Sequence, residues 1–363
     1  MSWHLEDIER NWLKGAAIAV TPEELVDAFD RTEAIFGREW LRARNATAWG
    51  AAPTLEVVRT GIKLAALDGV VGAEKLIERV RAGETSADAE LTAVYLLRHS
   101  RSTAEIELYP PISVANRTRV PDFRVRDRLD PWTYIEVARP DISDTQRRAN
   151  SVLGRLTEIV YSLKKSFTLE VFLLREPTDG EIEQLATDAT AFCRHEGLAK
   201  EYVGNLAILL LNHAPPNVVT PYIHPEDDHR PRLAMARVIA GGDEPARHVS
   251  VRMPYADERA EVFLNSEAEQ LPKNAPGFIM IDVSRAPGGI KSWVPLLRRR
   301  LQPQIHTRVG GIGLFTEGFF PTDSGLKWIF ETALIANSHA KLPPPEWIGL
   351  AVAEAGSAES TPT

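Results

Sequence analysis

Two acidic residues, Asp122 and Glu136, stand in short segments that have the composition of neighbouring β-strands. Residues 119–126 and 132–139 alternate apolar and polar side chains, and a turn-like stretch separates them. If this hairpin is centred on Leu129, Asp122 lies directly opposite Glu136, with their Cβ atoms about 5 Å apart. Two carboxylates at that distance repel each other. A shared proton, an arginine or a hard cation such as Mg²⁺ or Mn²⁺ would offset the repulsion.

The alternation along both strands predicts which side chains share the face of the two acids. Four apolar side chains point to the opposite face, where a helix can bury them: Phe123, Val125, Ile135 and Val137. Three residues accompany the acids: Arg124, Tyr134 and Ala138. In the plainest alternative, Arg124 or Arg119 neutralises the acids of an exposed hairpin, and nothing binds there.

The elements around the hairpin define the predicted fold, which is α/β. A helix from Ser86 to about Arg98 precedes three strands, and a second helix and further strands follow them. The predicted strands span residues 104–112, 119–126, 132–139, 168–174 and 206–211, and the helices after the hairpin span 143–165 and 179–195. The strand–helix–strand order of 168–211 suggests parallel pairing through a right-handed crossover.

Pro121-Asp122 on one strand and Glu136 on the next, within the order α-β-β-β-α-β, resemble the PD-(D/E)XK nucleases, the restriction-endonuclease-like superfamily. The resemblance covers about residues 85–212. It implies a metal-dependent endonuclease that acts on DNA, with Asp122 and Glu136 as catalytic ligands of Mg²⁺ or Mn²⁺. It also implies that Glu90, on the preceding helix, is an auxiliary metal ligand. Arg124 would then serve as a catalytic residue that contacts the phosphate.

The sequence departs from the family pattern at Ala138, where the family has a lysine that stabilises charge in the transition state. A regular strand points Arg139 away from the acids, so Arg124 is the better substitute by geometry. Three residues at the start of the next helix could also approach the site: Gln146, Arg147 and Arg148. The departure leaves open whether the chain is an enzyme. It could instead be an inactive nuclease fold that binds DNA or a protein partner, or an unrelated α/β protein.

Four regions follow from the pattern along the chain. We expect a helical N-terminal region (1–84), the nuclease-like core (85–215), an α/β extension or second lobe (216–350) and a disordered tail (351–363). Within the third region we expect strands at 233–239, 248–253, 278–283 and 311–315, and helices at 258–270, 292–301 and 325–336. Extension of the same sheet is slightly favoured over a separate lobe.

Bulk properties place further bounds on function. The net charge of −8 argues against coating nucleic acid by bulk electrostatics, although residues 98–165 carry 13 Lys and Arg against 9 Asp and Glu. A single cysteine, Cys193, and the absence of an apolar run of about 20 residues predict a cytoplasmic protein without a membrane partner. A homodimer is possible. The loop from His224 to His229 holds five potential metal ligands, but their spacing matches no zinc signature.

Overall fold

The computed structural model describes residues 3–46, 51–114, 117–194, 199–212, 232–241, 244–255, 259–286 and 288–355. The chain is mixed α/β and divides into two compact units, which are described one at a time. Unit 1 comprises Met1–Pro140, Arg259–Arg285 and Gly289–Thr363, and unit 2 comprises Asp141–Glu258 and Ala286–Gly288. Unit 2 therefore interrupts the sequence of unit 1 directly after the predicted hairpin.

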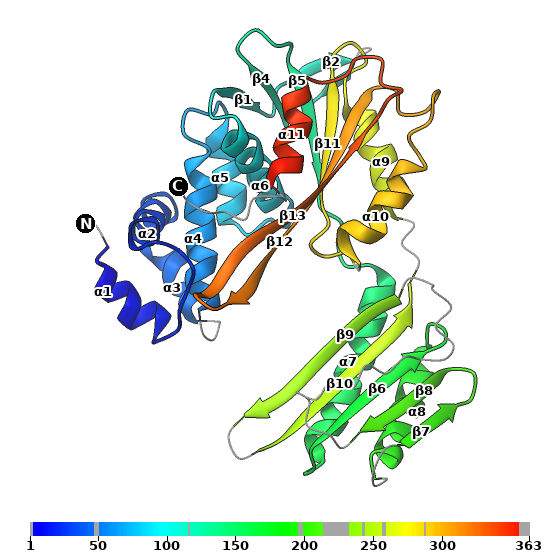
Figure 1. The fold of residues 1–363 in the computed structure, drawn as a ribbon. Helices are drawn as coiled ribbons and strands as arrows, with labels where there is room; N and C mark the ends of the chain where they lie inside the picture. Colours follow the sequence, from blue (N-terminus) through cyan, green and yellow to red (C-terminus); the bar gives the residue numbers. More distant parts are fainter. Residues whose placement is uncertain are drawn as a thin grey trace. The chain divides into compact units, whose positions relative to one another are not determined.

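Unit 1 is built on a six-stranded sheet with the order β1-β4-β5-β11-β12-β13 (Figure 1). Its strands are β1 (Ala104–Leu108), β4 (Phe123–Asp127), β5 (Thr133–Ala138), β11 (Gly277–Asp282), β12 (Val309–Thr322) and β13 (Gly325–Ala336). Strands β1, β4 and β5 form an antiparallel meander, β5, β11 and β12 run parallel, and β13 returns antiparallel to β12. A small hairpin of β2 (Ile112–Val114) and β3 (Arg117–Arg119) lies between β1 and β4 in the chain.

Helices cover the sheet of unit 1. These are α6 (Thr85–Ser100), α9 (Arg259–Gln270), α10 (Gly289–Arg298) and α11 (Glu346–Ala355). The main core joins α6 and α11 to one face of the sheet, where Leu91 and Leu97 lie in one buried cluster with Phe123, Val125 and Ile135. This is the apolar face that the alternation predicts. Helix α9 packs against β5 and β11, and α10 against β12 and β13.

The N-terminal part of unit 1 is helical, as predicted. It contains α1 (Leu5–Ile8), the π-helix η1 (Glu9–Leu13), α2 (Pro22–Phe36), α3 (Arg38–Ala46), α4 (Ala52–Ala65) and α5 (Ala73–Arg81). Thr21 and Glu24 form a capping box at the start of α2, which explains why the helix begins there. Helices α1, η1, α2, α3 and α4 share a core around Trp12 and Phe29, whereas α5 packs in the main core. Ile18 forms a β-bridge to Leu326 of the β12–β13 hairpin.

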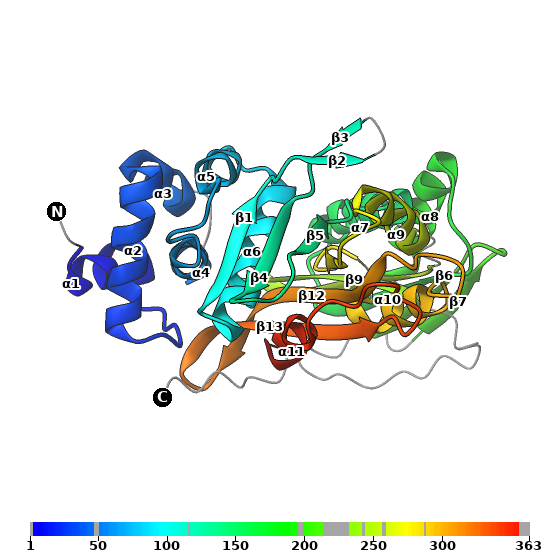
Figure 2. The ribbon, with the colours of Figure 1, turned by 90° about the horizontal axis from the view of Figure 1, so that it is seen from above.

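Unit 2 contains a five-stranded sheet, β7-β8-β6-β10-β9, with α7 and α8 packed on one face (Figure 2). The helices are α7 (Asp144–Ser162) and α8 (Asp179–Phe192), and the strands are β6 (Phe167–Leu173), β7 (Ala199–Val203), β8 (Ala207–Asn212), β9 (Arg232–Gly241) and β10 (Glu244–Pro254). Alternate side chains of β6, such as Leu169 and Val171, contribute to the core beneath the helices.

The predicted continuous core from residue 85 to 215 is interrupted in the structure. Strand 168–174, expected to complete the sheet of the hairpin, is β6 of unit 2, and it pairs antiparallel rather than parallel with β8. The parallel neighbour of β5 is β11, which begins more than a hundred residues later. Two parallel strands are joined by a crossover connection, and that connection can be of any length above a minimum. Local sequence therefore does not reveal that a whole unit is inserted between β5 and β11.

Two further predictions are wrong. Residues 325–336, expected to form a helix, are strand β13, because pairing with β12 along the whole segment satisfies their backbone groups. The boundary predicted for the disordered tail, residue 351, is also wrong, because Ala351 and Val352 lie in α11 and are fully buried. Of the strands expected to extend the sheet of the hairpin, 278–283 and 311–315 are β11 and β12 of that sheet, whereas 233–239 and 248–253 are β9 and β10 of the sheet of unit 2.

Candidate functional site

The hairpin that carries the two acids has the predicted register. Phe123 pairs with Ile135 and Val125 with Thr133, so the turn is centred on Leu129, whose side chain is fully exposed. Asp122 directly precedes β4, and Glu136 lies within β5. The side chains of Phe123, Val125 and Ile135 are completely buried, which opposes a slip of register that would turn them to the other face.

Backbone contacts hold Asp122 beside β5. Its Oδ2 accepts a hydrogen bond of 2.7 Å from the backbone N–H of Val137, and its carbonyl oxygen accepts one of 2.8 Å from Tyr109. Glu136 is 1% exposed, and its Oε1 has no hydrogen-bond partner within the described structure. An unpartnered carboxylate oxygen inside a protein is costly, so this atom marks a place where a proton or cation is expected.

The electrostatics of the two acids follow from burial and from each other. Burial raises the pKa of Glu136 to about 10, and the neighbouring Asp122 carboxylate contributes to the shift. Burial also raises the pKa of Asp122, with Glu90 and then Glu267 as further negative neighbours. At neutral pH the pair therefore holds at least one proton, and a cation would compete for that place.

Two more acids approach the pair from helices. Glu90 of α6 is 2% exposed and receives hydrogen bonds from Arg79 Nη1 (2.8 Å) and the hydroxyl of Tyr109 (2.7 Å). Glu267 of α9 contributes repulsion to both Asp122 and Glu136, and burial raises its own pKa. Acids from four elements thus share one region. No group of three or more His, Cys, Asp or Glu has metal-site geometry among the residues that the structure describes.

Arg124, predicted to contact a phosphate, is bound elsewhere. Its Nε lies 2.8 Å from Glu107 Oε2 and its Nη2 lies 2.5 Å from the same oxygen, while its guanidinium stands 4.4 Å from the ring centre of Trp132. The next arginine along the face, Arg126, makes the same kind of pair with Glu105. Cross-strand ion pairs therefore hold the arginines of β4, and neither is paired with Asp122 or Glu136.

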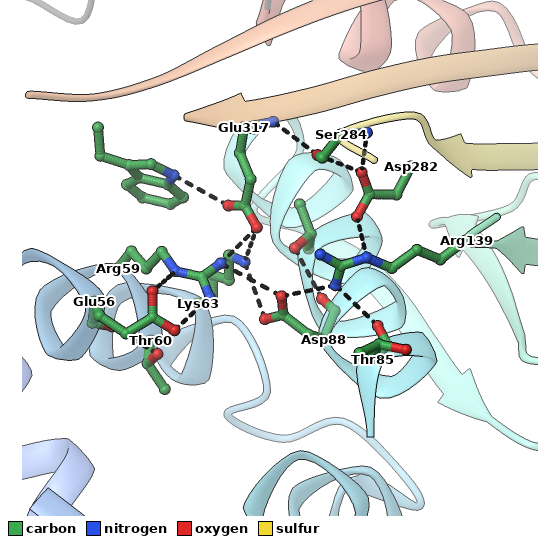
Figure 3. Close-up of polar contacts among 12 residues, drawn as sticks. Glu56, Arg59, Thr60, Lys63, Thr85, Asp88, Arg139, Asp282, Ser284 and Glu317 are labelled. Atoms are coloured by element: carbon green, nitrogen blue, oxygen red, sulfur yellow. Dashed lines mark hydrogen bonds and ion pairs between the residues drawn. The ribbon is translucent and has the colours of Figure 1, made fainter. Parts of the chain in front are cut away.

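Arg139 points away from the acid pair, as the alternation predicts. Its Nη1 lies 3.1 Å from Asp88 and donates to the carbonyl of Thr85 (3.0 Å), and its Nε lies 3.1 Å from Asp282 (Figure 3). It thereby ties the end of β5 to the first turn of α6 and to the end of β11. Its cationic group is occupied there, and it does not stand in for the lysine that Ala138 replaces.

Arg139 belongs to a larger, mostly buried ionic network at the carboxyl ends of β5 and β11 and at Glu317 within β12 (Figure 3). Lys63 of α4, which is completely buried, lies 2.9 Å from Glu317 and 3.3 Å from Asp88. Arg59 lies 2.5 Å from Glu317 and 2.6 Å from Glu56. Burial opposes the charge of Asp88, but the three neighbouring cations lower its pKa well below the usual range. The charges are mutually satisfied, which is the arrangement expected of a structural network.

No protein-family model, curated protein or solved structure matches the chain. None of the helices in the described part of the chain has both the length and the apolar composition that a bilayer span requires. The residues from His224 to His229 lie outside the described part of the chain.

Sequence reasoning found the acid pair but missed Glu267. The pattern predicts the helix that carries it, at 258–270, but places that helix in the C-terminal extension, and unit 2 separates it in sequence from the hairpin. Gln146, Arg147 and Arg148, at the start of the next helix, belong to unit 2. There Gln146 Oε1 accepts a hydrogen bond from the backbone N–H of Ser143, and Arg148 pairs with Glu176 and Asp179.

Proposed function

We propose that unit 1 is a restriction-endonuclease-like nuclease core that binds Mg²⁺ or Mn²⁺ through Asp122 and Glu136 and acts on DNA phosphodiesters. The element order supports this proposal. When unit 2 and the small β2–β3 hairpin are set aside, the remaining order is α6, β1, β4, β5, α9 and β11, or α-β-β-β-α-β, with β11 parallel to β5. Asp122 precedes the second strand and Glu136 lies in the third, in keeping with the pattern of the superfamily.

One observation carries the metal proposal. The half-buried carboxyl group of Asp122 lies beside the buried carboxyl group of Glu136, whose Oε1 has no partner within the described structure. Carboxylate oxygens with a few waters are the usual donors for Mg²⁺ and Mn²⁺. Glu90 and Glu267 are the auxiliary acids, and each would have to move or bind through water, because no three acids are arranged as ligands.

In this proposal the bound cation would neutralise charge that develops on the scissile phosphate. Asp122, fixed by the N–H of Val137, would hold its position, while Glu136 would lose its proton on metal binding. Glu90 keeps Tyr109 and Arg79 as partners and would adjust the local charge. Arg124 could contact a phosphate only by exchanging its bond to Glu107.

A second candidate is a nuclease fold that binds DNA or a protein partner without cleaving. Ala138 favours it, because no cation occupies the place of the family lysine, and Arg139 is engaged by Asp88 and Asp282. The two candidates share the metal site and differ only in chemistry.

Calorimetric titration with Mn²⁺ tests the site. We expect saturable binding to the wild type, loss of binding in Asp122→Asn, and unchanged binding in the control Glu105→Gln, whose side chain is 52% exposed and pairs with Arg126 on the same sheet. Absence of heat from the wild type, or equal binding by Asp122→Asn and wild type, would overturn the metal site.

Cleavage of supercoiled plasmid with Mn²⁺ then separates the candidates. If the chain is an active nuclease, the wild type cleaves the plasmid and Glu136→Gln does not. Cutting that appears only in Ala138→Lys identifies a site that has lost its lysine but kept its metal ligands. Metal binding without cutting by either protein favours the binding module.

A further inference from the structure

A cleft of about 780 Å³ opens between the N-terminal segment α1–η1 and helix α3 in unit 1. Its volume lies within the range of about 300–1,000 Å³ that is common for small-molecule sites. Its lining comes from elements that contribute nothing to the acid pair, so a function for it does not depend on the proposed nuclease activity.

The floor of the cleft is apolar and belongs to the N-terminal core. Trp12 and Leu41 line it and are 5% and 1% exposed, and Trp3 adds a half-buried indole. The rings of Trp3 and Trp12 meet edge-on at 6.4 Å, and Trp12 packs in the same way on Phe29 at 4.9 Å. These contacts hold the floor in place before any ligand arrives, which reduces the entropic cost of binding.

The rim of the cleft is cationic. Lys14, Arg38 and Arg42 line it against one acid, Asp7. Arg38 is paired with Glu33 at 3.0 Å. In the part of the chain that the structure describes, no carboxylate lies within ion-pair distance of Lys14 or Arg42, and both are exposed. Two cations at one opening, with no carboxylate partner among the described residues, favour an anionic ligand.

The backbone at the rim is unusual. Lys14 ends the π-helix η1 with φ at 53°, in the left-handed region that a side chain with a Cβ adopts at a cost. Isolated π-helical turns occur frequently at functional sites, and strain of this kind persists where the surrounding structure enforces it. Asn45 of α3 donates to the carbonyl of Asn11 at 3.2 Å and joins the two walls of the cleft.

We propose that this cleft binds a nucleotide, either free or at the end of a nucleic-acid strand. The apolar floor would contact the planar base, since aromatic surfaces accept any base by contact with its face. Lys14 and Arg42 would contact the phosphate, to which Arg offers a planar pair of donors and Lys a point charge.

Calorimetry on the full chain tests this proposal with adenosine 5′-monophosphate, adenosine, inorganic phosphate and a 5′-phosphorylated tetranucleotide. We expect saturable 1:1 binding of the monophosphate and binding at least about tenfold weaker for adenosine and for phosphate alone, because each lacks one half of the contacts. Tighter binding of the tetranucleotide would assign the cleft to a strand end, and equal binding would assign it to a free nucleotide.

Charge reversal at the rim provides the matched variants. Lys14→Glu and Arg42→Glu should each weaken the monophosphate at least about tenfold. Arg10→Glu is the control, because Arg10 is exposed on η1 but does not line the cleft, and it should stay within about twofold. Absence of saturable binding by the wild type, equal affinity for adenosine and its monophosphate, or equal loss in Arg10→Glu would each overturn the proposal.

Discussion

Replacing Lys63 by Met removes the charge at the centre of the buried network but keeps an unbranched side chain of similar length. Lys63 is fully buried, and its Nζ lies 2.9 Å from Glu317 and 3.3 Å from Asp88. Removing one partner of a buried ion pair typically costs about 3–5 kcal/mol, since the other partner is left as an uncompensated charge. Because Arg59 still contacts Glu317 and Arg139 still contacts Asp88, we expect the lower end, about 3 kcal/mol.

Tryptophan fluorescence in urea measures this loss of free energy of unfolding in unit 1. All eight tryptophans of the chain lie in unit 1, so the fluorescence change reports its unfolding and not that of unit 2. With a denaturant slope of about 3 kcal/mol per M, the loss lowers the midpoint by roughly 1 M.

The matched control is Arg31→Met, which breaks an ion pair of 3.1 Å with Asp68 at the surface, where the side chains are 35% and 68% exposed. Such exposed pairs contribute at most about 1 kcal/mol. If Lys63→Met cost no more free energy of unfolding than Arg31→Met, the network would not stabilise unit 1, and the reasoning would be refuted.

Other predictions concern the acids, the packing of the helices and the cysteine. Because the folded protein raises the pKa of Glu136 to about 10, above the unfolded value of about 4.3, the unfolded state releases this proton first as pH rises. In EDTA the free energy of unfolding of unit 1 should therefore fall as pH rises from about 5 to about 9, and Glu136→Gln should reduce this fall. Urea titrations at pH 5 and pH 8 measure it, and an equal change in free energy of unfolding between the two pH values in wild type and variant would contradict the prediction. A Cβ at Gly61 of α4 would lie 2.6 Å from the backbone Cα of Ala28 in α2, so Gly61→Ala should destabilise the protein by about 1–3 kcal/mol. Thermal unfolding measures this effect, and an unchanged melting temperature would show that the two helices separate at little cost. Burial raises the pKa of the Cys193 thiol to about 12, so Cys193 should react with a disulfide reagent at pH 8 only after urea is added, and rapid reaction of the native protein would disprove its burial.

The local features of the site could be predicted from residue types and their spacing. Alternation in 123–137 gave the register of the hairpin, and that register brought Asp122 beside Glu136. Burial of one face and exposure of the turn at Leu129 are properties of side-chain type and spacing, so they can be inferred without a partner strand. Capping residues likewise placed the start of α2 at Pro22.

The tertiary structure decided which distant segments complete the site. The pairing of β5 with β11 and the approach of Glu267 depend on contacts between segments of unit 1 that unit 2 separates in the sequence. Residues 325–336 became a strand because β12 was available to pair with them, an influence that no local pattern contains. Arg124 was drawn to Glu107, and Arg139 to Asp282, since each cation pairs with the acid that the assembled sheet places nearest. Side-chain periodicity is a local property, whereas the choice among possible partners is made by the folded chain as a whole.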